Sequence, residues 1–123
     1  MKRKVLVVDD ERMVADTLGI IFEKRGFDCR VFYTGADALV CADTFCPELL
    51  LCDLSMPGMS GLEVVATVTG KCPECRVLLL TGYYASLNSA RKWSRGHDAP
   101  SLVMTKPVLP ALLLEQANAL LLE

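Results

Sequence analysis

The sequence predicts an α/β protein, a five-stranded parallel sheet with helices on both faces. Three observations lead to this fold class. Short apolar runs of strand length alternate with longer segments whose apolar residues recur at helical spacing. Several of the runs are apolar throughout, as expected for parallel strands covered on both faces. A length of 123 residues suits a single domain, which we place over residues 1–123.

The first half of the chain contains three of the expected strands and two helices. Residues 5–8 are wholly apolar, and residues 12–25 follow with helical spacing of apolar side chains. Residues 28–32 form a more polar run, which we expect to lie near an edge of the sheet. A second helix is expected over 34–43. A third strand over 49–52 is apolar and is followed directly by an aspartate.

The second half continues the alternation to five βα units. Ser60 and Glu63 have the spacing of a capping box, which predicts that a helix begins there and runs to about residue 69. Pro110 suits the first turn of a last helix. The remaining elements are expected at 77–80 (strand), 86–95 (helix), 101–105 (strand) and 110–122 (helix).

Composition and charge exclude several classes of function. The formal net charge is -2 and no long basic run is present, which argues against direct binding of nucleic acid. The apolar stretch Val5–Val8 is interrupted by Asp9 and Asp10 and is too short for a signal peptide or a membrane span. We therefore expect a cytoplasmic protein that does not contact a membrane.

Six cysteines are many for this length. A secreted disulfide scaffold is one interpretation, but the ample apolar content and the lack of a signal peptide favour a cytosolic protein with reduced thiols. Cys72 and Cys75 have the spacing of a redox or zinc pair. A zinc site would need two more ligands, and His97 is the only histidine. We expect Cys72 and Cys75 to be surface-loop thiols.

Polar residues follow four of the expected strands, at the point where each strand ends. Asp9 and Asp10 follow the first strand, Asp53 the third, Thr81 the fourth and Lys106 the fifth. The carboxyl ends of parallel strands lie at one edge of the sheet, where α/β proteins bind ligands. One aspartate in such a place is usually a helix cap, and Asp10 alone would be interpreted so. The whole set at one edge predicts a site.

This set has the chemistry of phosphoryl transfer. Converging carboxylates repel one another, and a hard cation such as Mg2+ relieves the repulsion. A carboxylate nucleophile beside Mg2+ and a lysine is suited to in-line transfer, which needs positioning and neutralisation of charge. The sequence has no glycine-rich loop of Walker type, so a nucleoside triphosphate is not the expected donor.

Four segments together resemble the signature of response-regulator receiver domains of two-component signal transduction, including chemotaxis regulators. They are Val7–Glu11, Leu51–Gly61, Leu80–Thr81 and Lys106–Pro107. The resemblance covers the whole chain in order and implies a (βα)5 flavodoxin-like fold.

The resemblance also implies a role for each site residue. Asp53 would be the phosphoacceptor. Asp10 would bind Mg2+ directly and Asp9 mostly through water, with Asp53 and the backbone carbonyl of Ser55 as further ligands. Thr81 and Lys106 would contact the phosphoryl group.

Two features of the backbone follow from the same resemblance. The peptide bond between Lys106 and Pro107 is expected to be cis. Gly58 and Gly61 suit the loop after the acceptor, where a positive φ is easiest for glycine.

The resemblance further implies a switch that is no conventional enzyme but catalyses its own phosphorylation and dephosphorylation. The donor would be a sensor histidine kinase or a phosphotransfer protein, and phosphorylation would shift the fourth helix, fifth strand and fifth helix toward an active form that an effector reads. The leucine-rich last helix makes a homodimer through this face an open alternative to a monomer.

The sequence departs from the family pattern near the fifth strand. Val103 stands where the family often has tyrosine or phenylalanine, so switching is expected to differ, or Val103 is simply a core residue. The segment 89–100 is longer than usual, and Trp93 is expected to pack beneath it. Tyr83 is expected to cover the site and slow hydrolysis of the acyl phosphate.

Three rival interpretations remain at this stage. An aspartate-nucleophile phosphatase of the haloacid-dehalogenase type would need an Asp-x-Asp pattern after the first strand, where Asp9 and Asp10 are adjacent. A flavodoxin-like binding module would need a phosphate loop at the same place. A degenerate receiver that serves only as an interaction domain would not need the complete set of Asp9, Asp10, Asp53, Thr81 and Lys106.

Overall fold

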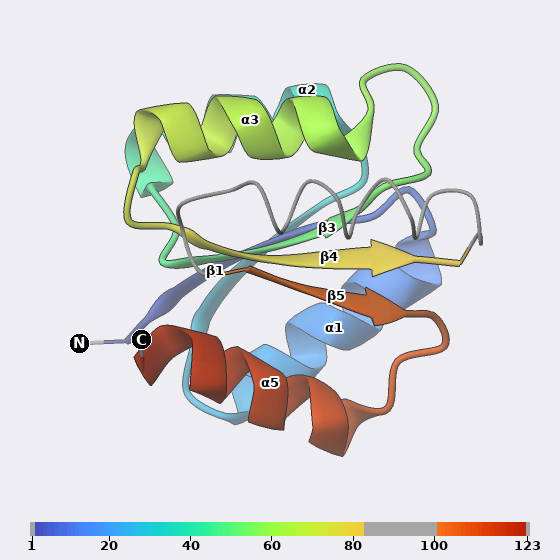
Figure 1. Ribbon diagram of the computed structural model, residues 1–123, viewed down its shortest axis with the longest axis vertical. Helices are drawn as coiled ribbons and strands as arrows, with labels where there is room; N and C mark the ends of the chain where they lie inside the picture. The colour runs from blue at the N-terminus through green and yellow to red at the C-terminus, as the bar shows by residue number, and fades with distance from the viewer. Residues whose placement is uncertain (1, 83–100, 123) are drawn as a thin grey trace.

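The computed structural model describes residues 2–82 and 101–122, and this part of the chain forms a parallel sheet with helices on both faces (Figure 1). The strands are β1 (Lys4–Val8), β2 (Asp28–Phe32), β3 (Leu49–Asp53), β4 (Arg76–Thr81) and β5 (Ser101–Thr105). The helices are α1 (Arg12–Lys24), α2 (Gly35–Phe45), α3 (Gly61–Lys71) and α5 (Pro110–Leu122). The predicted fold class is confirmed, while the expected helix at 86–95 lies outside the described residues.

The sheet order is β2-β1-β3-β4-β5, with all neighbouring strands parallel. The chain therefore moves from β1 to one side of the sheet and then crosses back to the other side at β3. A crevice opens at such a reversal, here outside the carboxyl ends of β1 and β3. The more polar strand β2 lies at an edge, as predicted.

Each face of the sheet packs against its own pair of helices. In Figure 1, α2 and α3 cover one face, and α1 and α5 cover the other. Leu6 and Val8 of β1 belong to the core under α2 and α3, whereas Val5 and Val7 belong to the core under α1 and α5. Because successive side chains of a strand point to opposite faces, both sets must be apolar. This explains why the strand sequences show no alternation.

The helix ends follow local signals in the sequence. Ser60 caps α3, since its hydroxyl accepts a hydrogen bond from the Glu63 amide at 3.3 Å, and Thr34 caps α2 in the same way through the Asp37 amide at 3.2 Å. Helix α2 extends to Phe45, two residues past the predicted end at Asp43. This two-residue extension is stabilised because Phe45 is buried in the core. Of the described helices, none combines the length and the apolar character needed to cross a membrane.

The prediction of surface-loop positions is wrong for both Cys72 and Cys75, and the prediction of a reduced thiol is wrong for Cys72, whereas Cys75 is a free thiol. Both are buried, with exposed fractions of 4% and 1%, and Cys72 forms a disulfide with Cys46. The reason is that the loop after α3 is short and leads directly into β4. The Cys75 amide donates to the Cys72 carbonyl at 3.0 Å, and the Arg76 amide donates to Glu48 at 2.9 Å, so the loop is held against the core.

Candidate functional site

The register of the strands brings the predicted site residues together. Val8 of β1 pairs with Cys52 of β3, so the residues that follow them, Asp9 and Asp53, are at equivalent positions on neighbouring strands. Asp53 in turn pairs with Leu80, and Thr81 with Thr105. Residues Asp9, Asp53, Thr81 and Lys106 thus arrive at one edge of the sheet from four different strands.

Three carboxylates form the centre of this site. One oxygen from each of Asp9, Asp10 and Asp53 lies within 4.8 Å of the others. Asp9 is fully buried and Asp53 is 3% exposed, whereas Asp10 is exposed at the rim. A set of oxygen donors with one open side matches what Mg2+ prefers, because Mg2+ keeps several waters and takes one or two carboxylates. The residues present therefore fit a hard divalent cation.

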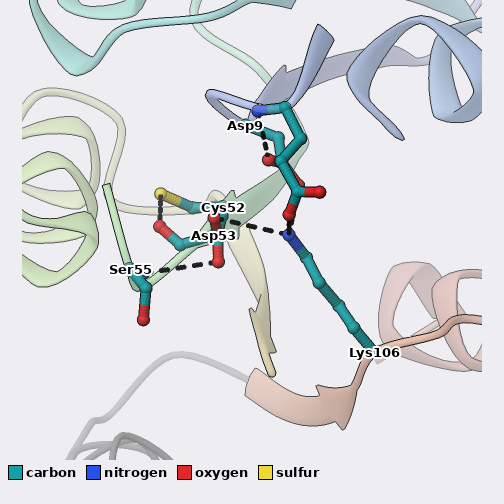
Figure 2. A network of polar contacts seen from close by, with 6 residues as sticks. Asp9, Cys52, Asp53, Ser55 and Lys106 are labelled. Atoms are coloured by element: carbon teal, nitrogen blue, oxygen red, sulfur yellow. Dashed lines mark hydrogen bonds and ion pairs between the residues drawn. The ribbon is translucent and has the colours of Figure 1, made fainter. Parts of the chain in front are cut away.

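Lys106 reaches from the end of β5 into the carboxylates (Figure 2). Its Nζ lies 2.8 Å from Asp9 Oδ2 and 3.4 Å from Asp53 Oδ2, and the lysine side chain is only 15% exposed. A third acidic residue, Glu11, pairs with the same Nζ through Oε1 at 3.2 Å. The single positive charge of Lys106 is therefore shared among three carboxylates and fully neutralises none of them.

The pKa values of Asp53 and Lys106 respond to this surrounding. Burial and the charge of Asp9 raise the pKa of Asp53 from 3.8 to about 6, although Lys106 and the Ser55 amide act in the opposite direction. For Lys106, burial alone would lower the pKa. The hydrogen bond to Asp9 and the charges of Asp53 and Asp9 outweigh burial and raise it. Lys106 is thus fully charged at neutral pH, whereas Asp53 in the metal-free protein takes up a proton at a higher pH than an ordinary aspartate.

The loop after Asp53 holds the side chain of this residue in place. The Ser55 amide donates to Asp53 Oδ1 at 3.3 Å (Figure 2). Gly58 has a φ of +76°, as predicted. Gly61 serves a different purpose from the predicted one: a Cβ atom there would lie 2.7 Å from Leu54 Cα and closer still to the Asp53 carbonyl oxygen. The start of α3 therefore packs directly on the backbone of Asp53 and Leu54.

Thr81 ends β4, one position after the strand partner of Asp53, and is 1% exposed. Its carbonyl accepts the amide of Lys106 at 2.9 Å, which fixes the point where the lysine leaves β5. The Leu54 amide, directly after Asp53, donates to the carbonyl of Leu80 at 3.0 Å. The backbones that carry Asp53, Thr81 and Lys106 are thus hydrogen-bonded to one another in sequence across the sheet.

The carboxylates open into a cavity of about 800 Å³ between α1 and the segment that follows β5. Asp10, Asp53 and Lys106 line its polar end, and apolar side chains such as Met13 and Val108 line the remainder. Glu11 also lines it and was missed by sequence reasoning. Its place as the third acid after β1 was the available signal.

The remaining sequence expectations have mixed outcomes. The peptide bond between Lys106 and Pro107 is cis, as expected. Val103 is partly buried and packs against the core under α2 and α3, which agrees with its interpretation as a core residue. The expectations for Tyr83 and Trp93 concern residues outside the described part of the chain.

A family model described as the response regulator receiver domain matches residues 5–118. The chain belongs to this family. Receiver domains act in two-component signalling as phosphorylation-dependent switches, and they interact with histidine kinases or phosphotransfer proteins and with effectors. The acidic site lies within the matched residues.

Solved structures agree with this assignment. A receiver domain protein (CheY-like) from Methanospirillum hungatei is 27% identical, with a TM-score of 0.86 over 98% of this receiver domain and 94% of that chain. The receiver domain of AraT, a response regulator from Geobacillus stearothermophilus, is 28% identical, with a TM-score of 0.82 over 98% and 94%. Chemotaxis protein CheY4 of Vibrio cholerae, at 22% identity, shares the fold, with a TM-score of 0.86 over 98% and 99%.

Proposed function

We propose that this receiver domain, taken as residues 1–123, accepts a phosphoryl group on Asp53 in a Mg2+-dependent reaction. The donor is the phosphohistidine of a sensor histidine kinase or of a phosphotransfer protein. The observation that carries the proposal is the convergence of Asp9, Asp10 and Asp53 within 4.8 Å, with Lys106 Nζ 3.4 Å from Asp53. This arrangement supplies a nucleophile, a cation site and a fixed positive charge in one place.

Asp10 is proposed to hold Mg2+ directly and Asp9 mostly through water. Asp53 and the backbone carbonyl of Ser55 complete the protein ligands. When bound, the cation neutralises charge on the carboxylates and on the transferring phosphoryl oxygens. Positive charge beside Asp53 also lowers its pKa from the raised value of about 6, which favours the ionised, nucleophilic form at neutral pH.

In the proposed step a carboxylate oxygen of Asp53 attacks phosphorus while the bond from phosphorus to the donor nitrogen breaks. The electron pair of that bond stays on the donor imidazole, and the phosphoryl group becomes an acyl phosphate on Asp53. Lys106 already contacts Asp53 and can follow the new phosphoryl oxygens as an ion pair. The Thr81 hydroxyl is proposed to donate to a further oxygen, since Thr81 follows Leu80, the strand partner of Asp53.

The output of the reaction is proposed to be a shift in the population of an active form. New contacts of the phosphoryl group with Thr81 and Lys106 pull on the ends of β4 and β5. The face that an effector reads would include β5 and α5. Leu112 and Leu122 of α5 are exposed, as is Leu109 directly before this helix. A homodimer through this leucine-bearing face stays a prediction, as does a cytoplasmic location.

The experiment is phosphorylation with acetyl phosphate, a small-molecule donor, followed by intact mass. We expect one added phosphoryl group in the presence of Mg2+ and none after chelation. Asp53→Asn removes the nucleophile and should abolish the addition. Asp37→Asn, which changes an exposed aspartate at the start of α2, serves as the matched control and should be phosphorylated like the unchanged protein.

Two results would contradict the proposal. Loss of phosphorylation in the unchanged protein, with a folded circular dichroism spectrum and saturating Mg2+, would indicate a receiver that only binds partners. Steady turnover of a phosphomonoester would indicate a phosphatase instead. Peptide mapping of the phosphorylated protein should place the group between Leu49 and Gly61, and any other location would refute the assignment to Asp53.

A further inference from the structure

The cysteines take no part in the proposed phosphoryl transfer, yet two of them are joined. Cys46 and Cys72 are separated by 26 positions in sequence, and the disulfide brings their Cα atoms to 5.8 Å. Cys46 is the residue after α2 and Cys72 is the residue after α3. The bond ties the carboxyl ends of two neighbouring helices, and in a βα fold these ends lie at the edge of the sheet opposite the acidic site.

One of the two sulfur-bearing residues faces solvent. Cys46 is exposed, whereas Cys72 is 4% exposed. Cleavage of a disulfide requires a thiolate to approach one sulfur from outside, and access decides which sulfur is attacked. The exposed position of Cys46 makes it the point of attack and leaves Cys72 as the buried leaving group.

The backbone at Cys46 is held in a disfavoured conformation. Its φ is +39° and its ψ is 83°, and among the described residues it is the only one besides glycines with positive φ. Pro47 follows directly, and a residue before proline is driven toward extended backbone. A side chain with a Cβ atom persists in such a conformation only where its surroundings enforce it. The cross-link to Cys72 is a constraint that acts on this residue.

The two helices remain packed without the bond. Ala42 and Phe45 of α2 are buried in the same core as Val68 of α3. Near the cross-link, Lys71 of α3 forms an ion pair with Asp43 of α2. The sulfur–sulfur bond can therefore open while the fold is retained.

Cys75 is not a suitable alternative partner for Cys72, although the two have CxxC spacing. Cys75 is 1% exposed, and burial raises the pKa of its thiol to about 12, so it stays protonated. Its Sγ donates to the Arg76 carbonyl at 3.3 Å, on the way into β4. The redox pair in this structure is therefore Cys46 with Cys72.

We propose that the disulfide between Cys46 and Cys72 is a reversible redox site, opened by a dithiol reductant and closed again by its oxidised form. One thiolate of the reductant attacks Cys46 Sγ, the bond to Cys72 breaks, and the Cys72 sulfur takes the electron pair and a proton. The second thiol then attacks the reductant's own sulfur and releases Cys46 as a thiol. The protein gains two electrons and two protons, and the dithiol becomes a cyclic disulfide.

The role of such a disulfide depends on the redox conditions of the compartment that contains the protein. In the cytoplasm, where the sequence predicts this protein to be, disulfides are usually transient and serve catalysis or redox sensing. Loss of the bond removes a closed loop of chain, so the unfolded state gains freedom and the folded state becomes less stable. The redox state would thus set how firmly the far ends of α2 and α3 are held. This inference stands independently of the proposed phosphorylation.

The test treats the oxidised full chain with dithiothreitol in native buffer, then alkylates it and maps the modified peptides. We expect new alkylation at Cys46 only after reduction, with a retained circular dichroism spectrum. The melting temperature should fall by roughly 10 °C on reduction. Oxidised dithiothreitol should restore it.

Two single variants separate the cross-link from a general effect of the reductant. Cys46→Ser should melt at the lower temperature with or without dithiothreitol. Cys41→Ser, which removes a free thiol on the same helix, should keep the full response. If the disulfide opens only in denaturant, the proposal that it is a redox site of the folded protein is refuted. Alkylation of Cys46 in oxidised protein, or an unchanged melting temperature on reduction, would refute the cross-link itself.

Discussion

At the scale of single residues, Asp53 shows how the surroundings of a carboxyl group set its reactivity. Burial and the neighbouring charge of Asp9 hold its pKa at about 6, against an ordinary value of 3.8. Lys106 offsets only part of this effect, because it also pairs with Asp9 and Glu11. In the metal-free protein, the ionised form of Asp53 is therefore energetically unfavourable. Added positive charge beside it stabilises the ionised form.

Replacement of Asp53 by asparagine should stabilise the metal-free protein in a pH-dependent manner. A carboxyl group whose pKa is higher in the folded state binds its proton more tightly there, so stability falls as pH rises from about 4 to about 6. Asp53→Asn has no such loss, and its free energy of unfolding should exceed that of the unchanged protein by about 1 to 3 kcal/mol at pH 7. Urea unfolding in the presence of a chelator measures the difference.

The same comparison at low pH provides the control. At pH 4 the folded protein carries a neutral Asp53, so the two proteins should differ little in stability. A constant difference from pH 4 to pH 7 would show that the substitution acts through packing and not through ionisation.

At the scale of secondary-structure elements, α3 packs directly on the backbone of Asp53. It begins at Gly61, whose backbone packs on Asp53 and Leu54 without room for a side chain. The hydroxyl of Ser60 fixes the first turn by capping the Glu63 amide. The start of α3 and the backbone after Asp53 therefore constrain each other's position.

Two glycine substitutions in α3 should have opposite effects. In Gly61→Ala the new methyl group meets backbone atoms that cannot rotate away, so we expect a loss of about 1 to 3 kcal/mol in stability. Gly70→Ala places a methyl group in open space near the other end of the helix and should gain about 0.5 to 1 kcal/mol. Urea unfolding of both variants measures these changes, and equal effects would refute the steric account of Gly61.

The sequence was informative about elements and site residues for a definite physical reason. Strand-length apolar runs report burial, and a polar residue after a parallel strand must emerge at one common edge. This suffices to predict the location of Asp53 and Lys106. The pairing of Cys46 with Cys72 has no comparable local signal, because it depends on where two helices end in space. The sharing of Lys106 with Glu11 likewise depends on side-chain reach.

At the scale of the whole molecule, acidic side chains gather at the carboxyl ends of the strands. The carboxyl edge gathers Asp9, Asp10, Glu11 and Asp53 around one lysine. This concentration of like charge is unfavourable for folding in the absence of a cation. Binding of a divalent cation and folding should therefore support each other.

Mg2+ should stabilise the domain as a ligand that binds only the folded state. At a concentration 100-fold above its dissociation constant, we expect about 2.7 kcal/mol of added stability, reversed by chelation. Asp10→Asn removes an exposed carboxylate that is proposed to bind the cation, creates no cavity, and should abolish most of this gain. Asp37→Asn should keep it. Urea titrations at several Mg2+ concentrations measure the effect, and a gain in Asp10→Asn equal to that of the unchanged protein would refute the site.

The assembly of the site from four strands has a consequence for incompletely folded chains. Lys106 and Glu11 meet across 95 positions of sequence, and Asp53 receives its lysine only once β5 has docked beside β4. A chain that has formed only the first four strands would contain Asp53 without the neighbouring positive charge of Lys106. The proposed phosphorylation is therefore conditional on complete folding, because a partly folded molecule would lack the lysine beside Asp53 and should not accept the phosphoryl group.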